Sequence, residues 1–338
     1  MIVKRVCQQL RDKYEFSVLT TLPRKRALEP VDHINIMPVK SYFELFSLPF
    51  APALITKLIR LRKKFDLIAI HYPFPLADIA IALSPYKFPN LIVYWHSEIY
   101  SQRWVARLLN PFTRRMLKKA KYIVVSSPSL LEHSKILKKH KEKVKIVPFG
   151  YQSNNLPSSQ PTESAFFLCI GRHVKYKGFE TLIRSVKLSN SKVKIVGSGP
   201  LLEQHRQLVK RLDLTNNIEF ITGATRAEIN QLAANCIALV LPSIYPSEAF
   251  AIVQIEAMAA GKPIINTNLK SGVPWVARHM REAITVPPGD TVELSEALVR
   301  LESDSDLRLR LSKNAYVRWQ NVFSDKMFLD ATDSLYSS

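Results

Sequence analysis

Two glutamates, Glu248 and Glu256, lie eight positions apart in the segment Pro242–Pro263 (P-S-I-Y-P-S-E-A-F-A-I-V-Q-I-E-A-M-A-A-G-K-P). A helix rises about 1.5 Å per residue, so the two carboxylates would lie roughly 12 Å apart along its axis. That separation excludes an acid and a base that act on one bond. Two carboxylates that far apart could bind the two ends of an elongated ligand. The spacing by itself fits a solvated helix face equally well.

The local pattern around the glutamates predicts a strand, a loop and a helix. The apolar run Ile237–Leu241 is typical of a buried parallel strand, and Ala249–Ala260 is rich in helix-forming residues. The first N–H groups of a helix have no partner within it. Those of Phe250, Ala251 and Ile252 could therefore bind an anionic or hydroxylated ligand.

A second cluster that could do chemistry is Gly171–Gly178 (G-R-H-V-K-Y-K-G), which follows the predicted strand Phe166–Ile170. Arg172 and Lys177 flank a turn whose glycines permit a close backbone approach. A guanidinium and an ammonium at such a turn suit a diphosphate. Taken alone, the pattern fits a solvated basic turn better.

Two further features are weak when taken separately. Gly197 and Gly199 in V-G-S-G-P follow the predicted strand Val193–Val196, and a turn that merely ends the strand explains the G-x-G pattern equally well. His96 follows the apolar run Leu91–Trp95, and a lone histidine after a strand is more often structural than catalytic.

The elements that would position these residues alternate between strands and helices, which indicates doubly wound α/β domains. A polar, Ser- and Pro-rich stretch at residues 152–163 predicts a linker between two such domains. The predicted strands are Phe16–Leu19, Ile34–Val39, Asp66–Ile70, Leu91–Trp95, Tyr122–Val125, Val144–Val147, Ala165–Ile170, Val193–Val196, Ile218–Ile221, Ile237–Leu241, Pro263–Ile265 and Ile284–Val286. Helices are predicted at residues 1–14, Thr56–Lys64 and Leu307–Ser337.

The order of these segments resembles glycosyltransferase family 4, whose members are retaining enzymes of the GT-B fold. S-E-A-F-A-I-V-Q-I-E is similar to the E-x7-E motif of that family, and G-R-H-V-K-Y-K-G to its G-R-x4-K-G segment. V-G-S-G-P resembles its G-x-G-P turn. Y-W-H-S-E-I resembles the H-S-D-I segment of a subgroup that makes bacterial polysaccharide and lipopolysaccharide. The likeness spans nearly the whole chain.

The resemblance implies two Rossmann-like doubly wound domains that face each other across a cleft. Residues 1–150 would form the acceptor side, residues 164–315 would bind the nucleotide sugar, and the helix at 316–338 would cross back to the first domain. The family usually opens with a strand and a Gly-Gly loop before its first helix. This sequence begins at that helix, so we expect the first domain to lack its usual first strand, through a truncated reading frame or a genuine loss.

The resemblance also implies roles for individual residues. His96 would approach the transferred sugar, Arg172 and Lys177 would neutralise the leaving diphosphate, and Glu248 would bind sugar hydroxyls. Residues expected to hold the nucleotide sugar are Gly171, Gly197, Gly199, Phe250, Ala251, Ile252 and Glu256. Ala251 stands where the family commonly has glycine. No Asp-x-Asp metal motif accompanies these segments, so neither a metal nor a further cofactor is expected.

The net charge of +20 is unevenly divided. Residues 1–150 hold 27 Lys and Arg against 10 Asp and Glu, whereas residues 151–338 hold 21 against 18. This asymmetry predicts an anionic partner for the first half. Arg103–Lys121 mixes basic and apolar residues in an interfacial pattern, or in that of a packed helix with a basic outer face, with Pro111 able to begin a helix. No nucleic-acid-binding signature accompanies the charge.

Cys7, Cys169 and Cys236 are isolated, which predicts small buried hydrophobic residues instead of a disulfide or a metal site. No apolar run reaches the length of a membrane helix, and no signal segment is evident at Met1. We therefore expect a cytoplasmic protein that lies peripherally on the inner face of the membrane.

The resulting hypothesis is a metal-independent, retaining hexosyltransferase. Its donor would be a nucleotide diphosphate sugar, first of all GDP-mannose, and its acceptor a lipid-linked saccharide or an oligosaccharide. Two alternatives remain open. One is a nucleotide-sugar epimerase of the same fold, and the other is a catalytically inactive scaffold or partner subunit.

Overall fold

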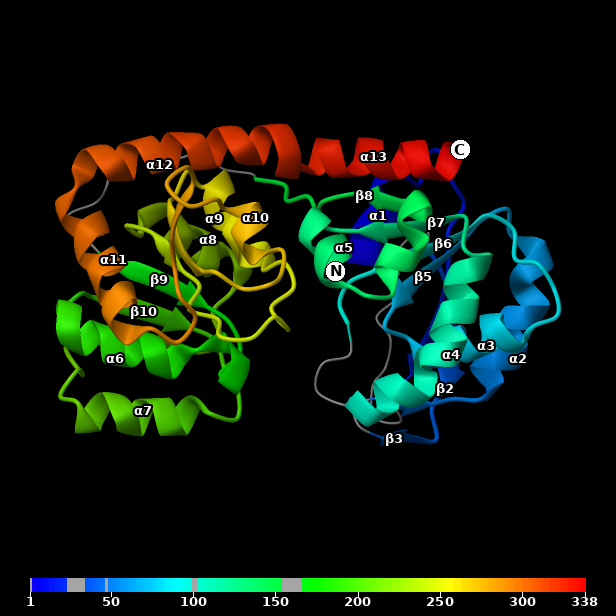
Figure 1. Ribbon diagram of the computed structural model, residues 1–338, viewed down its shortest axis with the longest axis horizontal. Coiled ribbons are helices and arrows are strands. Elements are labelled where there is room, and N and C mark those ends of the chain that lie inside the picture. The colour runs from blue at the N-terminus through cyan, green and yellow to red at the C-terminus, as the bar shows by residue number, and fades with distance from the viewer. Residues whose placement is uncertain (1, 23–33, 46–47, 99–102, 154–165) are drawn as a thin grey trace. The chain divides into compact units, whose positions relative to one another are not determined.

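The structure is a computed structural model that describes residues 2–22, 34–45, 48–98, 103–153 and 166–338 (Figure 1). Residues 154–163 of the predicted linker and Ile99 of the Y-W-H-S-E-I segment lie outside this part of the chain. Contacts divide the chain into two compact units. Unit 1 holds residues 1–126, 134–147 and 329–338, and unit 2 holds residues 127–133 and 148–328.

Unit 1 is organised around a four-stranded parallel sheet of order β5-β6-β7-β8. A parallel pair, β1-β2, and an antiparallel pair, β3-β4, stand apart from it. Its strands are β1 (Ser17–Leu22), β2 (Asn35–Lys40), β3 (Phe43–Leu45), β4 (Leu48–Phe50), β5 (Ile68–Tyr72), β6 (Leu91–Trp95), β7 (Tyr122–Val125) and β8 (Val144–Ile146). Its helices are α1 (Ile2–Gln9), α2 (Ala53–Leu61), α3 (Pro75–Leu83) and α4 (Arg103–Lys119), with 3₁₀ segments at Arg62–Lys64 and Leu137–Lys143.

The end of helix α13 (Asp325–Ser337) packs against the first residues of unit 1. Tyr14 donates a hydrogen bond from its hydroxyl to Asp333 Oδ1 at 2.8 Å, and Lys13 forms an ion pair with the same carboxylate. The rings of Tyr14 and Tyr336 meet edge to face, 5.6 Å between centroids. Unit 1 is thus assembled from residues far apart in the chain.

Unit 2 is a six-stranded parallel sheet of order β11-β10-β9-β12-β13-β14. Its strands are β9 (Phe167–Ile170), β10 (Val193–Val196), β11 (Ile218–Ile221), β12 (Leu239–Val240), β13 (Ile264–Thr267) and β14 (Ala283–Val286). Its helices are α5 (Pro128–His133), α6 (Phe179–Ser189), α7 (Leu202–Arg211), α8 (Arg226–Asn235), α9 (Ile252–Ala259), α10 (Val273–Val276), α11 (Thr291–Ser303) and α12 (Ser305–Arg318), with a 3₁₀ turn at Lys175–Lys177 and a π-helical turn at Trp319–Phe323.

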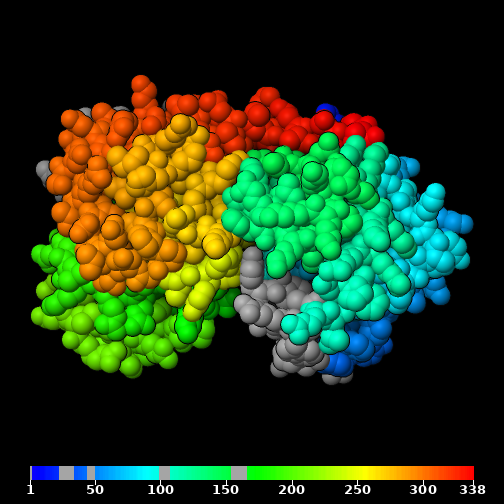
Figure 2. All heavy atoms as spheres, in the orientation of Figure 1, coloured from blue at the N-terminus to red at the C-terminus, as the bar shows by residue number. Residues whose placement is uncertain are grey.

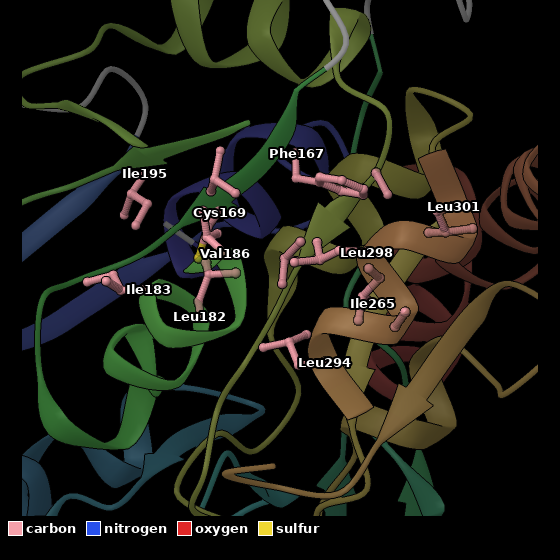
Figure 3. Close-up of a cluster of buried hydrophobic side chains, with 14 of the residues drawn as sticks. Phe167, Cys169, Leu182, Ile183, Val186, Ile195, Ile265, Leu294, Leu298 and Leu301 are labelled. Atoms are coloured by element: carbon pink, nitrogen blue, oxygen red, sulfur yellow. The ribbon is translucent and has the colours of Figure 1, made fainter. Parts of the chain in front are cut away.

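The core of unit 2 is filled by side chains from its sheet and from the helices that cover it (Figure 3). Phe167 and Cys169 of β9 contribute from the sheet, Leu182 and Val186 from α6, and Leu298 from α11. Each is at most 1% exposed. Continuous apolar strands between two layers of helices are the pattern of a buried parallel sheet, as the sequence predicts.

Several local predictions are confirmed and others need correction. The strands β6, β7, β10 and β11 have the predicted bounds. The first helix ends at Gln9 instead of residue 14, and Thr56–Lys64 is an α-helix that begins at Ala53 and tightens to 3₁₀ geometry at Arg62. The three cysteines are free and buried, as expected, and burial raises the pKa of the Cys169 and Cys236 thiols to about 12.

The prediction that Pro111 begins a helix is wrong, because it lies inside α4. A proline there cannot donate to the carbonyl of Arg107, four residues earlier. Because Pro111 is exposed, water can bond to the Arg107 carbonyl instead. The later half of α4 is packed, with Met116 and Leu117 fully buried, while Leu108 is 65% exposed.

Candidate active site

The strand order of unit 2 reverses between β9 and β12, because β10 and β11 lie on one side of β9 and the later strands on the other. In an open parallel sheet, ligands bind outside the carboxyl ends of the strands at such a switch point. The two loops that begin there are residues 171–178, after β9, and residues 241–251, after β12. They contain Arg172, Lys177 and Glu248.

A buried ion pair joins these two loops. Lys177 Nζ lies 2.5 Å from Glu248 Oε2, and each side chain is 10% exposed. Ser243 donates its hydroxyl to the same carboxylate oxygen at 3.0 Å. A backbone hydrogen bond from Ile244 N to Tyr176 O, at 2.8 Å, also connects the loops. The Lys177 ammonium and the Glu248 carboxylate are thus held together at the switch point.

Glycines allow the loops at this edge to approach closely. A Cβ on Gly178, which has a φ of +67°, would lie 2.0 Å from Pro242 O. One on Gly197, with a φ of +145°, would lie 1.9 Å from Gly171 O. No other residue fits such contacts in these conformations. Gly171 and Gly197 therefore bring the ends of β9 and β10 together, which is a structural role that the sequence reading left open.

The β9 loop is further held by a pair of histidines. His173 Nδ1 and His205 Nδ1 of α7 share a hydrogen bond of 2.8 Å, and the backbone of His173 packs on Gly199. Burial, with the neighbouring His205, lowers the pKa of His173 to about 4, and burial also lowers that of His205. Both rings are therefore neutral at pH 7.

Arg172 differs from Lys177 in being exposed. In the part of the chain that the structure describes, its guanidinium has no hydrogen-bond or ion-pair partner. Its five donors are therefore open to a ligand at the carboxyl edge of the sheet. A guanidinium matches two phosphate oxygens at once, which an ammonium cannot do.

Helix α9 begins at Ile252, three residues later than predicted, because Ala251 adopts a left-handed conformation (φ +59°, ψ +79°). Residues in that conformation do not continue an α-helix. The N–H groups of Phe250, Ala251 and Ile252 donate to no backbone carbonyl among the residues described. Their backbone hydrogen-bonding capacity is thus unused among these residues, although the first two precede the helix. The Phe250 ring itself is buried against Phe149.

A buried polar network supports the loop before α9. Gln254 Nε2 donates to Phe250 O at 3.2 Å and to Val273 O at 3.3 Å, while its Oε1 accepts from Asn266 Nδ2 at 3.0 Å. Thr267 Oγ1 donates to Ser243 O at 2.6 Å. Fully bonded buried amides fix one geometry, because breaking any of these bonds leaves a buried polar atom unpaired.

Glu256 is not free at its position in α9. Arg226, the first residue of α8, holds Glu256 Oε1 at 2.9 Å and lies over the Tyr151 ring, 5.2 Å from its centroid. The Tyr151 hydroxyl in turn contacts Asn230 Oδ1 at 3.3 Å. Glu256 is 12% exposed and Arg226 46% exposed, so the guanidinium lies on the open side of the pair.

His96 belongs to unit 1, where it follows β6. Its Nε2 shares a hydrogen bond of 2.9 Å with Nδ1 of His71 in β5, and the two rings are stacked. The Tyr94 ring also stacks on His71, at 4.8 Å between centroids. Burial lowers the pKa of both histidines, that of His71 to about 3. The His96 imidazole is therefore neutral at pH 7.

Unit 2 thus gathers most of the predicted site residues at one edge of its sheet. Three contributing residues were not predicted: Ser243 and Arg226, which bind the two motif glutamates, and His205, which binds the β9 loop. Ser243 lies five residues before Glu248, within the quoted segment, and could have been found there. Arg226 and His205 lie in other helices, and nothing in their local sequence relates them to the site.

These features define a doubly wound α/β domain with a candidate ligand site at its switch point, and comparison with known proteins identifies the family. The model described as "Glycosyl transferases group 1" matches residues 151–318, and that described as "Glycosyltransferase Family 4" matches residues 1–153. The chain therefore belongs to glycosyltransferase family 4, with the predicted GT-B fold.

Curated relatives cover most of the chain. O-antigen chain mannosyltransferase C of Escherichia coli is 28% identical over 91% of this chain and 84% of its own length. D-rhamnosyltransferase WbpZ of Pseudomonas aeruginosa is 27% identical over 83% of this chain and 76% of its own. Lipopolysaccharide core biosynthesis glycosyltransferase LpsD of Rhizobium meliloti is 36% identical over 52% and 50%.

Solved structures share the fold at low sequence identity. Sucrose-phosphate synthase from Thermosynechococcus elongatus superposes with a TM-score of 0.81 and 19% identity, covering 99% of this chain and 92% of its own. Anabaena HepE in complex with UDP gives a TM-score of 0.80 and 19% identity, covering 99% and 95%. In the part of this chain that the structure describes, no helix is both long and apolar enough to cross a membrane.

Proposed function

We propose that this glycosyltransferase moves a hexose, first of all mannose from GDP-mannose, to a lipid-linked saccharide or an oligosaccharide in bacterial surface polysaccharide synthesis. The observation that carries this proposal is the meeting of Lys177 and Glu248 at the switch point, beside the exposed Arg172. The names of the curated relatives support the pathway and the sugar, since one is an O-antigen chain mannosyltransferase and another a lipopolysaccharide glycosyltransferase.

In the proposed reaction the bond between the anomeric carbon and the diphosphate breaks, and negative charge grows on the diphosphate oxygens. Arg172 and Lys177 stabilise that charge, as do the open amides of Phe250 and Ala251. Glu248 binds sugar hydroxyls, and its bonds to Lys177 and Ser243 fix the direction of its carboxylate. The acceptor oxygen attacks on the same face, and its proton passes to a donor phosphate oxygen, which retains the anomeric configuration.

Two other residues have proposed roles. Glu256, held by Arg226, binds the ribose hydroxyls through its second oxygen. His96, neutral and bonded to His71, approaches the transferred sugar as a hydrogen-bonding group and not as a cation. We propose that the reaction needs no metal ion, so it should proceed in the presence of EDTA.

The test is a matched set of binding and turnover measurements on the full chain. Isothermal titration with GDP-mannose, UDP-glucose and other nucleotide sugars identifies the donor. Release of nucleoside diphosphate, with and without a lipid-linked saccharide fraction, then reports transfer. Turnover that requires the acceptor, with an α-linked product from an α-linked donor, supports the proposal. Binding without turnover indicates an inactive partner subunit, and conversion of the donor without acceptor indicates an epimerase.

We further propose that the protein works in the cytoplasm at the inner face of the membrane, through the basic surface of unit 1. Helix α4 exposes four basic side chains, those of Arg107, Arg114, Arg115 and Lys118. Leu108 of the same helix is 65% exposed. Basic residues attract anionic lipid and lose that attraction as salt screens them. Vesicle flotation should show a preference for anionic lipid that fades at high salt. Equal binding to neutral vesicles would contradict this part of the proposal.

A further inference from the structure

Unit 2 has a basin of about 410 Å³ that none of the proposed donor-site residues lines. One wall is the turn before β14, with Arg278, Arg281 and Glu282, and the other is the end of α12 with Arg318 and the π-helical turn after it. Figure 2 shows gold atoms of residues near 280 bordering the orange-red atoms of residues near 315 along the upper edge of this unit.

The basin holds three guanidiniums and one carboxylate. Glu282 is 2% exposed, and both of its oxygens are bound by Arg278, at 3.0 Å from Nε and 2.5 Å from Nη2. A bidentate pair of this kind neutralises one guanidinium. Arg318 shares the same Glu282 carboxylate at 4.0 Å, and Arg281 has no carboxylate partner among the residues described, so positive charge exceeds negative charge in the basin.

Arg318 contributes a largely buried guanidinium to the basin. Its Nε and Nη2 donate to the carbonyl oxygens of Val276 and Trp275, at 2.9 and 2.7 Å, which are neutral acceptors. The Glu282 carboxylate is 4.0 Å away. Burial, and then the nearby Arg278 charge, lower the pKa of Arg318 to about 10. Arginine stays charged at pH 7 even so, and the local field is therefore positive.

The rest of the lining consists of Arg281, Asn314 and Asn321, with the apolar side chains of Val317 and Val322. Arg281 is exposed, and in the part of the chain described its guanidinium has no hydrogen-bond or ion-pair partner. Asn314 Nδ2 donates to Arg281 O at 2.9 Å, which fixes the turn. Asn321 lies on the π-helical turn, a rare geometry that is frequent at functional sites.

We propose that this basin is a second ligand site, which binds a phosphate-class anion between Arg281, Arg318 and the side-chain amide of Asn321. Guanidiniums match phosphate oxygens in a planar, two-point fashion. The basin has the volume of about 14 water molecules at about 30 Å³ each. It is therefore larger than a phosphate ion needs and has room for a phosphate ester.

Hydrogen bonds connect the basin to the loop of residues 241–251, the donor loop. Arg318 binds the carbonyls of α10, and Gln254, which supports the loop before α9, donates to Val273 O at the start of the same helix. Gly272 N, one residue earlier, donates to Ala249 O at 2.8 Å. An anion that holds Arg318 therefore acts on a helix that the donor loop also contacts.

Calorimetric titration of the full chain with inorganic phosphate and, separately, with glucose 6-phosphate tests the proposal at constant ionic strength. Arg281→Ala should weaken binding about tenfold, the loss of one charge-assisted hydrogen bond. Asn321→Asp, which keeps the shape but adds a negative charge, should do the same. The matched control is Arg310→Ala, since Arg310 is an exposed arginine of α12 outside the basin. It should leave the affinity unchanged.

Tighter binding of the ester than of inorganic phosphate means that the basin holds a phosphorylated metabolite, while equal binding means that it holds free phosphate. Equal affinity in the wild type, Arg281→Ala and Asn321→Asp would overturn the proposal, as would binding that is lost in Arg172→Ala instead. Neither result would contradict the proposed transfer activity, because that activity is measured separately and Arg281→Ala should still bind the nucleotide sugar.

Discussion

Lys177 Nζ and Glu248 Oε2 meet at 2.5 Å, although 71 residues separate them in the chain. Each comes from one of the two loops that begin where the strand order of unit 2 reverses. The pair is nearly buried, so its two charges depend on each other. Because both residues are also proposed to contact the donor, stability and activity should be coupled at this point.

Lys177→Met should lower the free energy of unfolding by about 3–5 kcal/mol, because it leaves the Glu248 carboxylate buried without its counter-charge. Urea denaturation followed by circular dichroism measures this. Lys175→Met is the matched control, since Lys175 lies two residues earlier and is exposed. The double variant Lys177→Met/Glu248→Leu should recover most of the stability yet transfer no sugar. Equal unfolding curves for Lys177→Met and Lys175→Met would contradict the buried pair.

Arg172→Ala should separate activity from stability. Its side chain is exposed, so the free energy of unfolding should change by no more than about 0.5 kcal/mol. Sugar transfer should fall by about 10²–10³-fold, as expected for a group that stabilises developing charge. The control Arg184→Ala removes an exposed arginine of α6 that pairs with Glu180. Unchanged transfer in Arg172→Ala would remove this residue from the proposed site.

Ala251→Gly should stabilise the protein by up to about 1 kcal/mol, because glycine adopts the left-handed conformation of this residue without the penalty of a Cβ. Ala257→Gly, in the middle of α9, should instead destabilise it by about 1 kcal/mol. Thermal unfolding of both variants gives the two signs. Destabilisation in both would mean that Ala251 bears no backbone strain.

Stability should depend on pH through His173 and His205. Both have a pKa below the ordinary value of 6.5 in the folded state, His173 at about 4. Between these values the unfolded chain binds more protons, so the free energy of unfolding should fall as pH drops from about 6.5 to about 4. Arg206 faces the same pair and adds to the effect.

The comparison of His205→Gln with wild type between pH 5 and pH 8 measures this contribution. The variant should lose less stability on acidification, because glutamine keeps a hydrogen-bonding group but does not titrate. His133→Gln serves as the control, since His133 is exposed. The same pH slope in all three proteins would show that the pair does not titrate as described.

The fold could be predicted from the sequence because apolar runs such as Leu91–Trp95 and Val193–Val196 mark buried strands one by one. The order of motifs also led to the right family. The start of α9 could not be predicted, because Ala251 is a good helix former whose left-handed conformation depends on its neighbours. Arg226 escaped notice for a different reason. Its link to Glu256 is made by packing of α8 against α9, and a charged residue at a helix start carries no sign of its partner.

Unit 1 draws its last ten residues, 329–338, from the far end of the chain, whereas no part of unit 2 lies beyond residue 328. During synthesis a ribosome therefore delivers all of unit 2 before unit 1 has its final helical segment. Domains generally fold as units as they emerge, the amino-terminal one first. In this protein the unit that is begun first is completed last, so nascent chains should pass through a stage in which unit 2 is whole while unit 1 still lacks its last ten residues.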